Sequence, residues 1–437
     1  MKNFILIIGA LSILTLGATA QVAPTSSFDV DGIKVILKPT VKQIVNVSLY
    51  FRGGVGNYPA EKAGIEKLAL DGTLDCGTVK YAAGLFKGKA DGIGAELNAV
   101  AGLDNGKISL NCIVKYFNEG WELLAAAATT PLYEEGAFGI MKQKKIGELQ
   151  QSDGNPDTKL RMLAVGAAFK GTPYAINPNG TTDALSALTA AEVKNYYFGT
   201  LLNKSRIFIV VVGNVSKEDI IAKVKAAFST LPAGASYAPH LAEVPAFSFN
   251  AVTVEQRAIS TNYILGIMNA PAYSSPEYVP FMLSFSELHG LLYTEIRTRR
   301  HLSYAPSADL HASLLPYADV YVSTTDPRAS VEVMNNVLRF MKGKNIANRS
   351  LNQIKALYIT ANYRRQESSD ALADILGRSE TLGGWEIAEQ FPAIIQRTTR
   401  SEMSDAFGKY VAGVTWTYLG DKSKADEAMD AFKKPIN

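Results

Sequence analysis

The stretch TAAEVKNYYFGTLLNKSRIFIVVVGN, residues 189–214, decides the fold because a similar stretch follows in the second half of the chain. It joins the segment Thr-Ala-Ala-Glu-Val to an aromatic run and then to an apolar strand that stops at Gly213. About 210 residues later, TRSEMSDAFGKYVAGVTWTYLG at 399–420 has the same order. The chain has 437 residues, so this separation is close to half its length. We therefore predict one duplicated unit of about 200 residues.

Strands and helices alternate within each unit. Period-two, β-branched runs predict strands at 33–37, 45–51, 108–114 and 206–212, and later at 320–323 and 414–420. Apolar residues at helical spacing predict helices from about 61 onward and at 121–128, 135–151, 219–231 and 330–341. This order favours an α+β fold in which each sheet is covered by helices on one side.

The segment PAGASYAP, residues 232–239, is the best candidate for a linker between the two units. We therefore expect an N-terminal domain at 21–233, a linker at 234–244 and a C-terminal domain at 245–437. The two domains are expected to face each other across a cleft.

Composition and charge exclude several classes of protein. Lys plus Arg is 44 and Asp plus Glu is 41, which argues against a basic nucleic-acid binder and a polybasic membrane-surface protein. Two cysteines and four histidines supply neither a disulfide scaffold nor a Cys/His zinc finger. The sequence also lacks Gly-x-Ser-x-Gly, the P-loop and His-Glu-x-x-His.

Residues 1–20 are typical of an export signal. Lys2 is followed by an apolar run from Phe4 to Leu16 and by the small-residue cleavage site Ala18-Thr19-Ala20. The run is short for a membrane helix, which needs about 20 apolar residues. We expect a mature chain that starts near Gln21, has no membrane span after removal of the signal and is periplasmic or secreted.

Several landmarks in fixed order resemble the pitrilysin/insulinase-like M16 zinc peptidases and their mitochondrial processing peptidase relatives. They are Ala63-Gly64-Ile65 at the start of a helix, Asn155-Pro156, VVGNV at 211–215 and EIRTRRHLSY at 295–304. The resemblance covers nearly the whole mature chain. It implies two homologous domains, each an antiparallel-rich sheet covered by helices, as in mitochondrial processing peptidase.

The chain departs from the inverted zinc motif of this family, His-x-x-Glu-His. At the matching positions, Lys67 replaces the first His, Leu70 the catalytic Glu and Asp71 the second His, whereas Glu148 matches the third ligand. A lysine ammonium repels a cation, and leucine accepts no proton from water. We predict an ion pair between Lys67 and Asp71 and no resident cofactor, and we keep a weak hard-cation site at Asp71 and Glu148 as an alternative.

The resemblance matches Arg297 and Tyr304 to the C-terminal pair that helps to hold the substrate backbone. A guanidinium and a phenol are suitable donors to a peptide carbonyl. The resemblance therefore implies a non-catalytic subunit that binds extended peptides and complements a zinc-bearing M16 partner, or a homodimer. The zinc is expected in the partner subunit.

Two other functions and one structural question stay open. The chain is alternatively a stand-alone peptide-binding or scaffolding protein, or a metallopeptidase with an atypical metal site. Cys76 and Cys112 are either a disulfide, which export permits, or two buried thiols.

Overall fold

Residues 23–238, 243–247, 251–343 and 348–436 are described by a computed structural model. The expected signal at 1–20 lies outside the described residues, as does part of the expected linker, 239–242. Within the described ranges, no helix combines the length and the hydrophobicity needed to cross a bilayer.

The first half of the chain forms a six-stranded sheet in the order β1-β2-β6-β3-β5-β4. Its strands are β1 (Ser26–Val30), β2 (Ile33–Pro39), β3 (Ile44–Arg52), β4 (Glu96–Ala101), β5 (Asn105–Ile113) and β6 (Ile207–Gly213). Only β2 and β6 pair in parallel, and the other pairs are antiparallel.

The second half forms a five-stranded sheet in the order β7-β11-β8-β10-β9. Its strands are β7 (Ala251–Gln256), β8 (Asn262–Asn269), β9 (Ser307–His311), β10 (Tyr317–Thr324) and β11 (Thr415–Gly420). Again one pair, β7 with β11, is parallel. Apart from β1, the two sheets correspond strand for strand, which confirms two homologous units with antiparallel-rich sheets.

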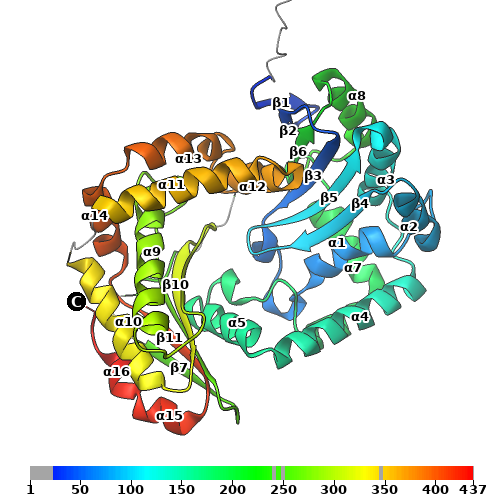
Figure 1. The fold of residues 1–437 in the computed structure, drawn as a ribbon. Helices are drawn as coiled ribbons and strands as arrows, with labels where there is room; N and C mark the ends of the chain where they lie inside the picture. The colour runs from blue at the N-terminus through cyan, green and yellow to red at the C-terminus, as the bar shows by residue number, and fades with distance from the viewer. Residues whose placement is uncertain (1–22, 239–242, 248–250, 344–347, 437) are drawn as a thin grey trace, which may run out of the picture.

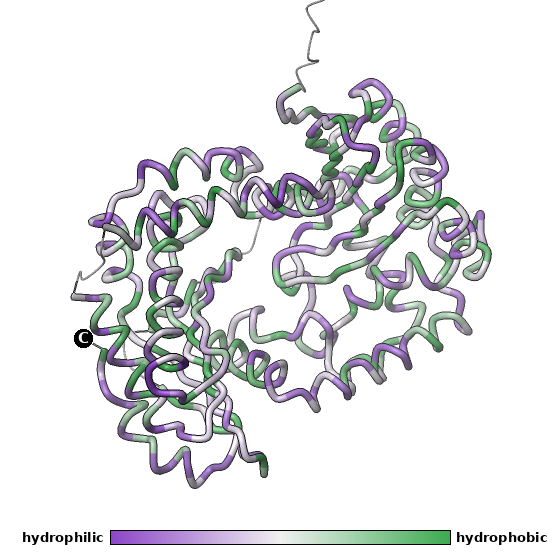
Figure 2. Tube along the Cα trace, in the orientation of Figure 1, coloured by the Kyte–Doolittle hydropathy of each residue, from purple (hydrophilic) through white to green (hydrophobic). Residues whose placement is uncertain are grey.

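Helices surround both sheets (Figure 1). The first half contributes α1 (Ile65–Asp75), α2 (Ala83–Gly92), α3 (Phe117–Thr129), α4 (Glu135–Gly154), α5 (Pro156–Ala168), α6 (Thr182–Ala187), α7 (Ala190–Tyr196) and α8 (Lys217–Phe228). The second half contributes α9 (Tyr278–Leu292), α10 (Pro327–Lys342), α11 (Asn348–Arg365), α12 (Ser369–Thr381), α13 (Glu386–Arg397), α14 (Arg400–Tyr410), α15 (Lys422–Glu427) and α16 (Met429–Lys433). Figure 2 shows hydrophobic and hydrophilic residues alternating along the outer helices, as expected of helices with one face on a core.

Strand β6 is buried on both faces, which explains its continuous apolar run. Ile207, Ile209 and Val211 belong to the core shared with the helices of the first half. Phe208, Val210 and Val212 instead lie in a second core with Leu372, Ala373, Leu376 and Trp385 of the second half. The expectation of helices on one side of each sheet was therefore incomplete.

The two halves exchange helices. Helix α12 packs on β3 and β6 of the first sheet, and α5 packs on β8 and β11 of the second sheet (Figure 1). Each sheet therefore has its own helices on one face and a helix of the other half on the opposite face.

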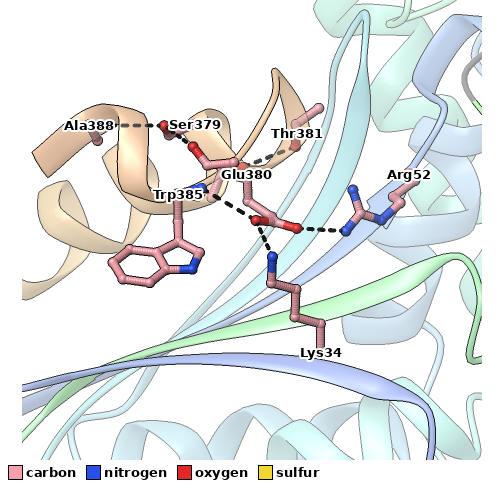
Figure 3. A network of polar contacts seen from close by, with 9 residues as sticks. Lys34, Arg52, Ser379, Glu380, Thr381, Trp385 and Ala388 are labelled. Carbon is pink, nitrogen blue, oxygen red and sulfur yellow. Dashed lines mark hydrogen bonds and ion pairs between the residues drawn. The ribbon is translucent and has the colours of Figure 1, made fainter. Parts of the chain in front are cut away.

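A buried carboxylate on α12 fixes this exchange. Glu380 pairs with Lys34 of β2 at 2.8 Å and with Arg52 of β3 at 3.0 Å, and it accepts a hydrogen bond from the Trp385 backbone N–H at 3.3 Å (Figure 3). Its side chain is only 7% exposed. Because charge-assisted hydrogen bonds are strong when shielded from water, this network holds the two halves in one orientation.

Cys76 and Cys112 are both free and buried. Burial raises the pKa of Cys76 to about 12 and that of Cys112 to about 11. Both side chains therefore stay protonated at neutral pH and act as small apolar groups in the core.

Candidate functional site

Helix α1 carries the positions matched to the zinc motif, and a close glycine contact fixes its start. Gly64 precedes the helix with a φ of 88°. A Cβ at Gly64 would lie 2.5 Å from a Leu185 methyl carbon and 2.8 Å from the Cα of Gly180. Only glycine allows this approach. The helix consequently begins at Ile65 and not near Glu61, where a short 3-10 turn stands.

Leu70, at the position matched to the catalytic Glu, is part of the hydrophobic core. It is fully buried, and a Cβ at Gly106 of β5 would lie 2.5 Å from a Leu70 methyl carbon. The side chain therefore packs directly against the sheet. It has no atom that could take a proton from a water molecule.

A continuous chain of ion pairs joins α1 and α4 through Lys67, Asp71, Lys145 and Glu148. Lys67 Nζ lies 2.6 Å from Asp71 Oδ1, so the predicted pair is present. Lys145 Nζ lies 3.2 Å from Asp71 Oδ2 and 3.1 Å from a Glu148 carboxylate oxygen. Burial lowers the pKa of Lys145, but the two carboxylates outweigh burial and the net shift is upward. Lys145 is therefore charged at neutral pH.

The donors at this position do not fit zinc. Both oxygens of Asp71 face lysine ammonium groups, which occupy the place of a cation. No imidazole or thiolate stands beside them, and in the described part of the chain no three His, Cys, Asp or Glu side chains gather as a metal site. Two carboxylates without a nitrogen or sulfur donor do not select zinc.

Lys145 is the member of this site that sequence reasoning missed. It stands three residues before Glu148 on the same helix, and residues at this spacing share a helix face. The spacing of three residues could have predicted the pair between Lys145 and Glu148. The contact of Lys145 with Asp71 across two helices is tertiary and has no local signal.

A groove runs beside these ion pairs along the edge of the first sheet. Its volume is about 540 Å³, and its lining includes Lys67, Asp71, Lys145 and residues 96–99 of β4. Strand β4 pairs with β5 on one side and is the last strand of the sheet on the other. An edge strand offers unpaired backbone N–H and C=O groups, which an added strand can pair with.

Arg297 and Tyr304 are brought together in the second half. Arg297 lies in a π-helical extension of α9, Tyr293–Thr298. Its guanidinium carbon is 3.9 Å from the centroid of the Tyr304 ring and 4.9 Å from that of Tyr293. Tyr304 is 77% exposed and open to a ligand, whereas Arg297 is partly buried beside it. Across the described residues, no hydrogen bond or ion pair joins them to Lys67, Asp71 or Glu148.

Comparison with known proteins finds similarity to M16 peptidases and their relatives. The family model described as the peptidase M16 inactive domain matches residues 187–358. Subunit 1 of the mitochondrial cytochrome b-c1 complex of Caenorhabditis elegans is 21% identical over 213 residues. That match covers 49% of this chain and 45% of the relative, so the chain spans less than half of the relative's length.

Solved structures share the fold over most of the chain. One is a peptidase M16 inactive domain from Pseudomonas fluorescens, with a TM-score of 0.83 and 17% identity. The match spans 91% of this chain and 98% of the Pseudomonas chain. Another is the periplasmic protease PqqL of Escherichia coli, with a TM-score of 0.75 and 15% identity. The match spans 96% of this chain and 49% of the PqqL chain. Residues 187–358 thus belong to the inactive-domain family of M16 peptidases, and the chain as a whole has the M16 fold.

Proposed function

We propose that this chain is a non-catalytic M16 subunit that binds extended peptides and complements a zinc-bearing partner. The observation that carries the proposal is the placement of Lys67 and Lys145 against Asp71, at 2.6 and 3.2 Å. With ammonium groups in place of a metal and Leu70 in place of a base, the described site on α1 and α4 has no group that activates water. Hydrolysis then requires a partner that carries His-x-x-Glu-His.

The groove beside β4 supports the peptide-binding part of the proposal. Backbone hydrogen bonds to an edge strand hold an extended peptide without demanding a particular sequence. Along β4 the side chains alternate between exposed and partly covered, with Glu96, Asn98 and Val100 exposed. A peptide added at this edge would lie next to the ion pairs of α1 and α4.

Arg297 and Tyr304 are proposed as the contribution of this chain to a shared chamber. Tyr304 presents its hydroxyl on an exposed surface, Arg297 is partly buried beside it, and the cation–π contact between them orients the guanidinium group. Donors held in this way suit a peptide carbonyl or a developing oxyanion.

We also propose that the two halves divide at the expected linker and that the chain is exported. Helix α8 ends at Phe228 and β7 begins at Ala251, which leaves room for a linker at 234–244 between domains 21–233 and 245–437. Export agrees with the signal expected at 1–20, and PqqL, a structural relative, is a periplasmic protease.

The test mixes the purified chain with a candidate partner that carries the zinc motif and follows hydrolysis of a fluorogenic peptide. We expect the mixture to exceed the partner alone. Arg297→Ala should lower the gain about tenfold or more, in line with the loss of an oriented donor. Arg299→Ala is the matched control, because Arg299 is exposed next to the same segment and forms a local ion pair with Glu295 at 2.6 Å.

Three outcomes would contradict the proposal. Equal activity of Arg297→Ala and wild type would remove the assigned role of Arg297. Peptide binding without any zinc-motif partner on co-purification would favour a stand-alone binding or scaffolding protein. One equivalent of tightly bound zinc in the lone chain, with chelator-sensitive cleavage, would identify a metallopeptidase with an atypical site.

A further inference from the structure

A second cavity lies within the second half, away from α1. Its volume is about 390 Å³, which is in the range of small-ligand sites, roughly 300–1,000 Å³. Residues of α9, α11, α12 and α13 line it. Helices α11 and α13 lie against each other and against α9, and α12 lies against α13 (Figure 1).

One wall of this cavity is a cluster of aromatic rings. Tyr273 and Tyr278 meet edge to face at 4.9 Å between centroids, and Phe391 lies 5.1 Å from Tyr273 and 5.8 Å from Tyr278. Met282 and Ile359 continue the apolar lining. A wall of this kind accepts an apolar or aromatic side chain.

The charges around the cavity are unbalanced. Arg365 and Arg378 line it, are exposed, and have no hydrogen bond or ion pair from their guanidinium groups to any part of the chain that the structure describes. The carboxylate in the lining, Asp374, is already paired with Lys107 and accepts a hydrogen bond from the Tyr50 hydroxyl. The two guanidinium groups therefore have no carboxylate partner in the lining. The planar guanidinium group of arginine can donate two parallel hydrogen bonds to a carboxylate.

Arg378 also lines a cavity in the space between the halves. A cavity of about 440 Å³ there is lined by the β4–β5 hairpin of the first half and by residues 310–313 of the second half. Ala312, Asp374 and Arg378 line both cavities, so the two are adjacent. A peptide that lies between the halves would therefore lie next to the aromatic cavity, with Arg378 between the two.

We propose that the aromatic cavity binds the free C-terminal end of a peptide. Arg378, with Arg365, holds the terminal carboxylate, and the wall of Tyr273, Tyr278 and Phe391 takes an apolar last side chain. This inference rests on the proposed peptide-binding function and adds a substrate class to it, namely peptides with an unblocked C-terminus and an apolar last residue.

The experiment uses the full chain and one fluorescent decapeptide that ends in Phe, made as the free acid and as the C-terminal amide. Fluorescence anisotropy gives the two dissociation constants. We expect the acid to bind at least about tenfold more tightly than the amide, the loss expected when one charge-assisted contact disappears. Replacing the last Phe by Gly should also weaken binding of the acid.

Variants then assign the contact. Arg378→Gln should abolish the preference for the acid, and Arg378→Lys should keep part of it. Arg364→Gln is the matched control, because Arg364 is an exposed arginine next to Arg365 on α11 that does not line the cavity. It should leave both constants unchanged.

The outcomes separate this inference from the proposed function. Equal binding of acid and amide would overturn the C-terminal site while peptide binding itself stands. No binding of either peptide would overturn both. An acid preference that survives Arg378→Gln and Arg365→Gln would place the carboxylate elsewhere and overturn the assignment.

Discussion

Glu66 is a fully buried acid directly before Lys67 on α1. It accepts hydrogen bonds from the Tyr196 hydroxyl at 2.7 Å and from the Asn57 amide at 3.2 Å, while its other oxygen has no hydrogen-bond partner among the described residues. Burial raises the pKa of Glu66 from 4.5 to about 7, because desolvation outweighs these two hydrogen bonds. The protonated form therefore persists in the folded protein up to neutral pH.

This raised pKa predicts that the protein loses stability as the pH rises from about 4.5 to about 7. In that window the folded chain still binds a proton that the unfolded chain has released, so the free energy of unfolding falls with pH. At about 1.36 kcal/mol per pKa unit, the full loss from Glu66 is about 3 kcal/mol. Urea denaturation between pH 4 and pH 8 measures this loss.

Glu66→Gln should remove most of this dependence and be the more stable form at pH 8. Tyr196→Phe, which removes a donor to the ionised carboxylate, should instead raise the pKa further and deepen the loss. Parallel pH curves for wild type and Glu66→Gln would show that Glu66 does not titrate in this window.

At the scale of single residues, the sequence predicted the ion pair of the candidate site but only part of its composition. Lys67 and Asp71 are four residues apart on one helix, so their contact is local and readable. Lys145 reaches Asp71 from a different helix, and its contact depends on how α1 and α4 pack. The same holds for Glu66, whose burial follows from the whole core and not from its neighbours in sequence.

At the scale of elements, the repeated segments at 189 and 399 form the same structure twice. Thr189 caps α7 and Thr399 caps α14, each in a reciprocal capping box with the Glu three residues later. In both capping boxes, the threonine side chain accepts a hydrogen bond from the backbone N–H of that Glu. The duplication therefore extends to the hydrogen bonds that begin the helices.

Thr399→Ala should lower the free energy of unfolding by about 1 kcal/mol, within the 0.5–2 kcal/mol usual for a lost N-cap. Thr189→Ala should cost a similar amount, because its cap has the same geometry. Serine at either position keeps the acceptor and should change stability little. Chemical denaturation of the four variants checks this, and alanine and serine variants of equal stability would contradict it.

The ends of elements were less predictable than their existence. The strand expected from Ile108 begins at Asn105, since Asn105, Gly106 and Lys107 pair in register with residues 52, 51 and 50 of β3. These three residues have no strand pattern of their own. The partner strand imposes the extended conformation, and a partner is not visible in a local window.

At the scale of the whole molecule, the duplication and the fold class followed from the sequence, but the exchange of α5 and α12 did not. Each of these helices has an apolar face, and an apolar face does not specify which sheet it will cover. The continuous apolar run of β6 indicated burial on both faces, without indicating that the second cover would come from residues 372–385 of the other half.

The Glu380 network is a buried polar link between the halves, and its removal should be costly. Glu380→Gln keeps the shape of the side chain but leaves the charges of Lys34 and Arg52 without their partner. Breaking a buried ion pair costs about 3–5 kcal/mol. Because the side chains of Lys34 and Arg52 are 39% and 22% exposed, we expect a loss of about 2–3 kcal/mol in the free energy of unfolding.

Glu389→Gln is the matched control. Glu389 also links the halves, through an ion pair with Lys38 at 3.0 Å, but its side chain is 40% exposed. Its loss should therefore cost at most about 1 kcal/mol. Denaturation followed by tryptophan fluorescence reports both variants, since Trp385 lies at this interface and donates its backbone N–H to Glu380. Equal stability of the two variants would mean that apolar packing of α12 alone, and not the buried carboxylate, holds the halves together.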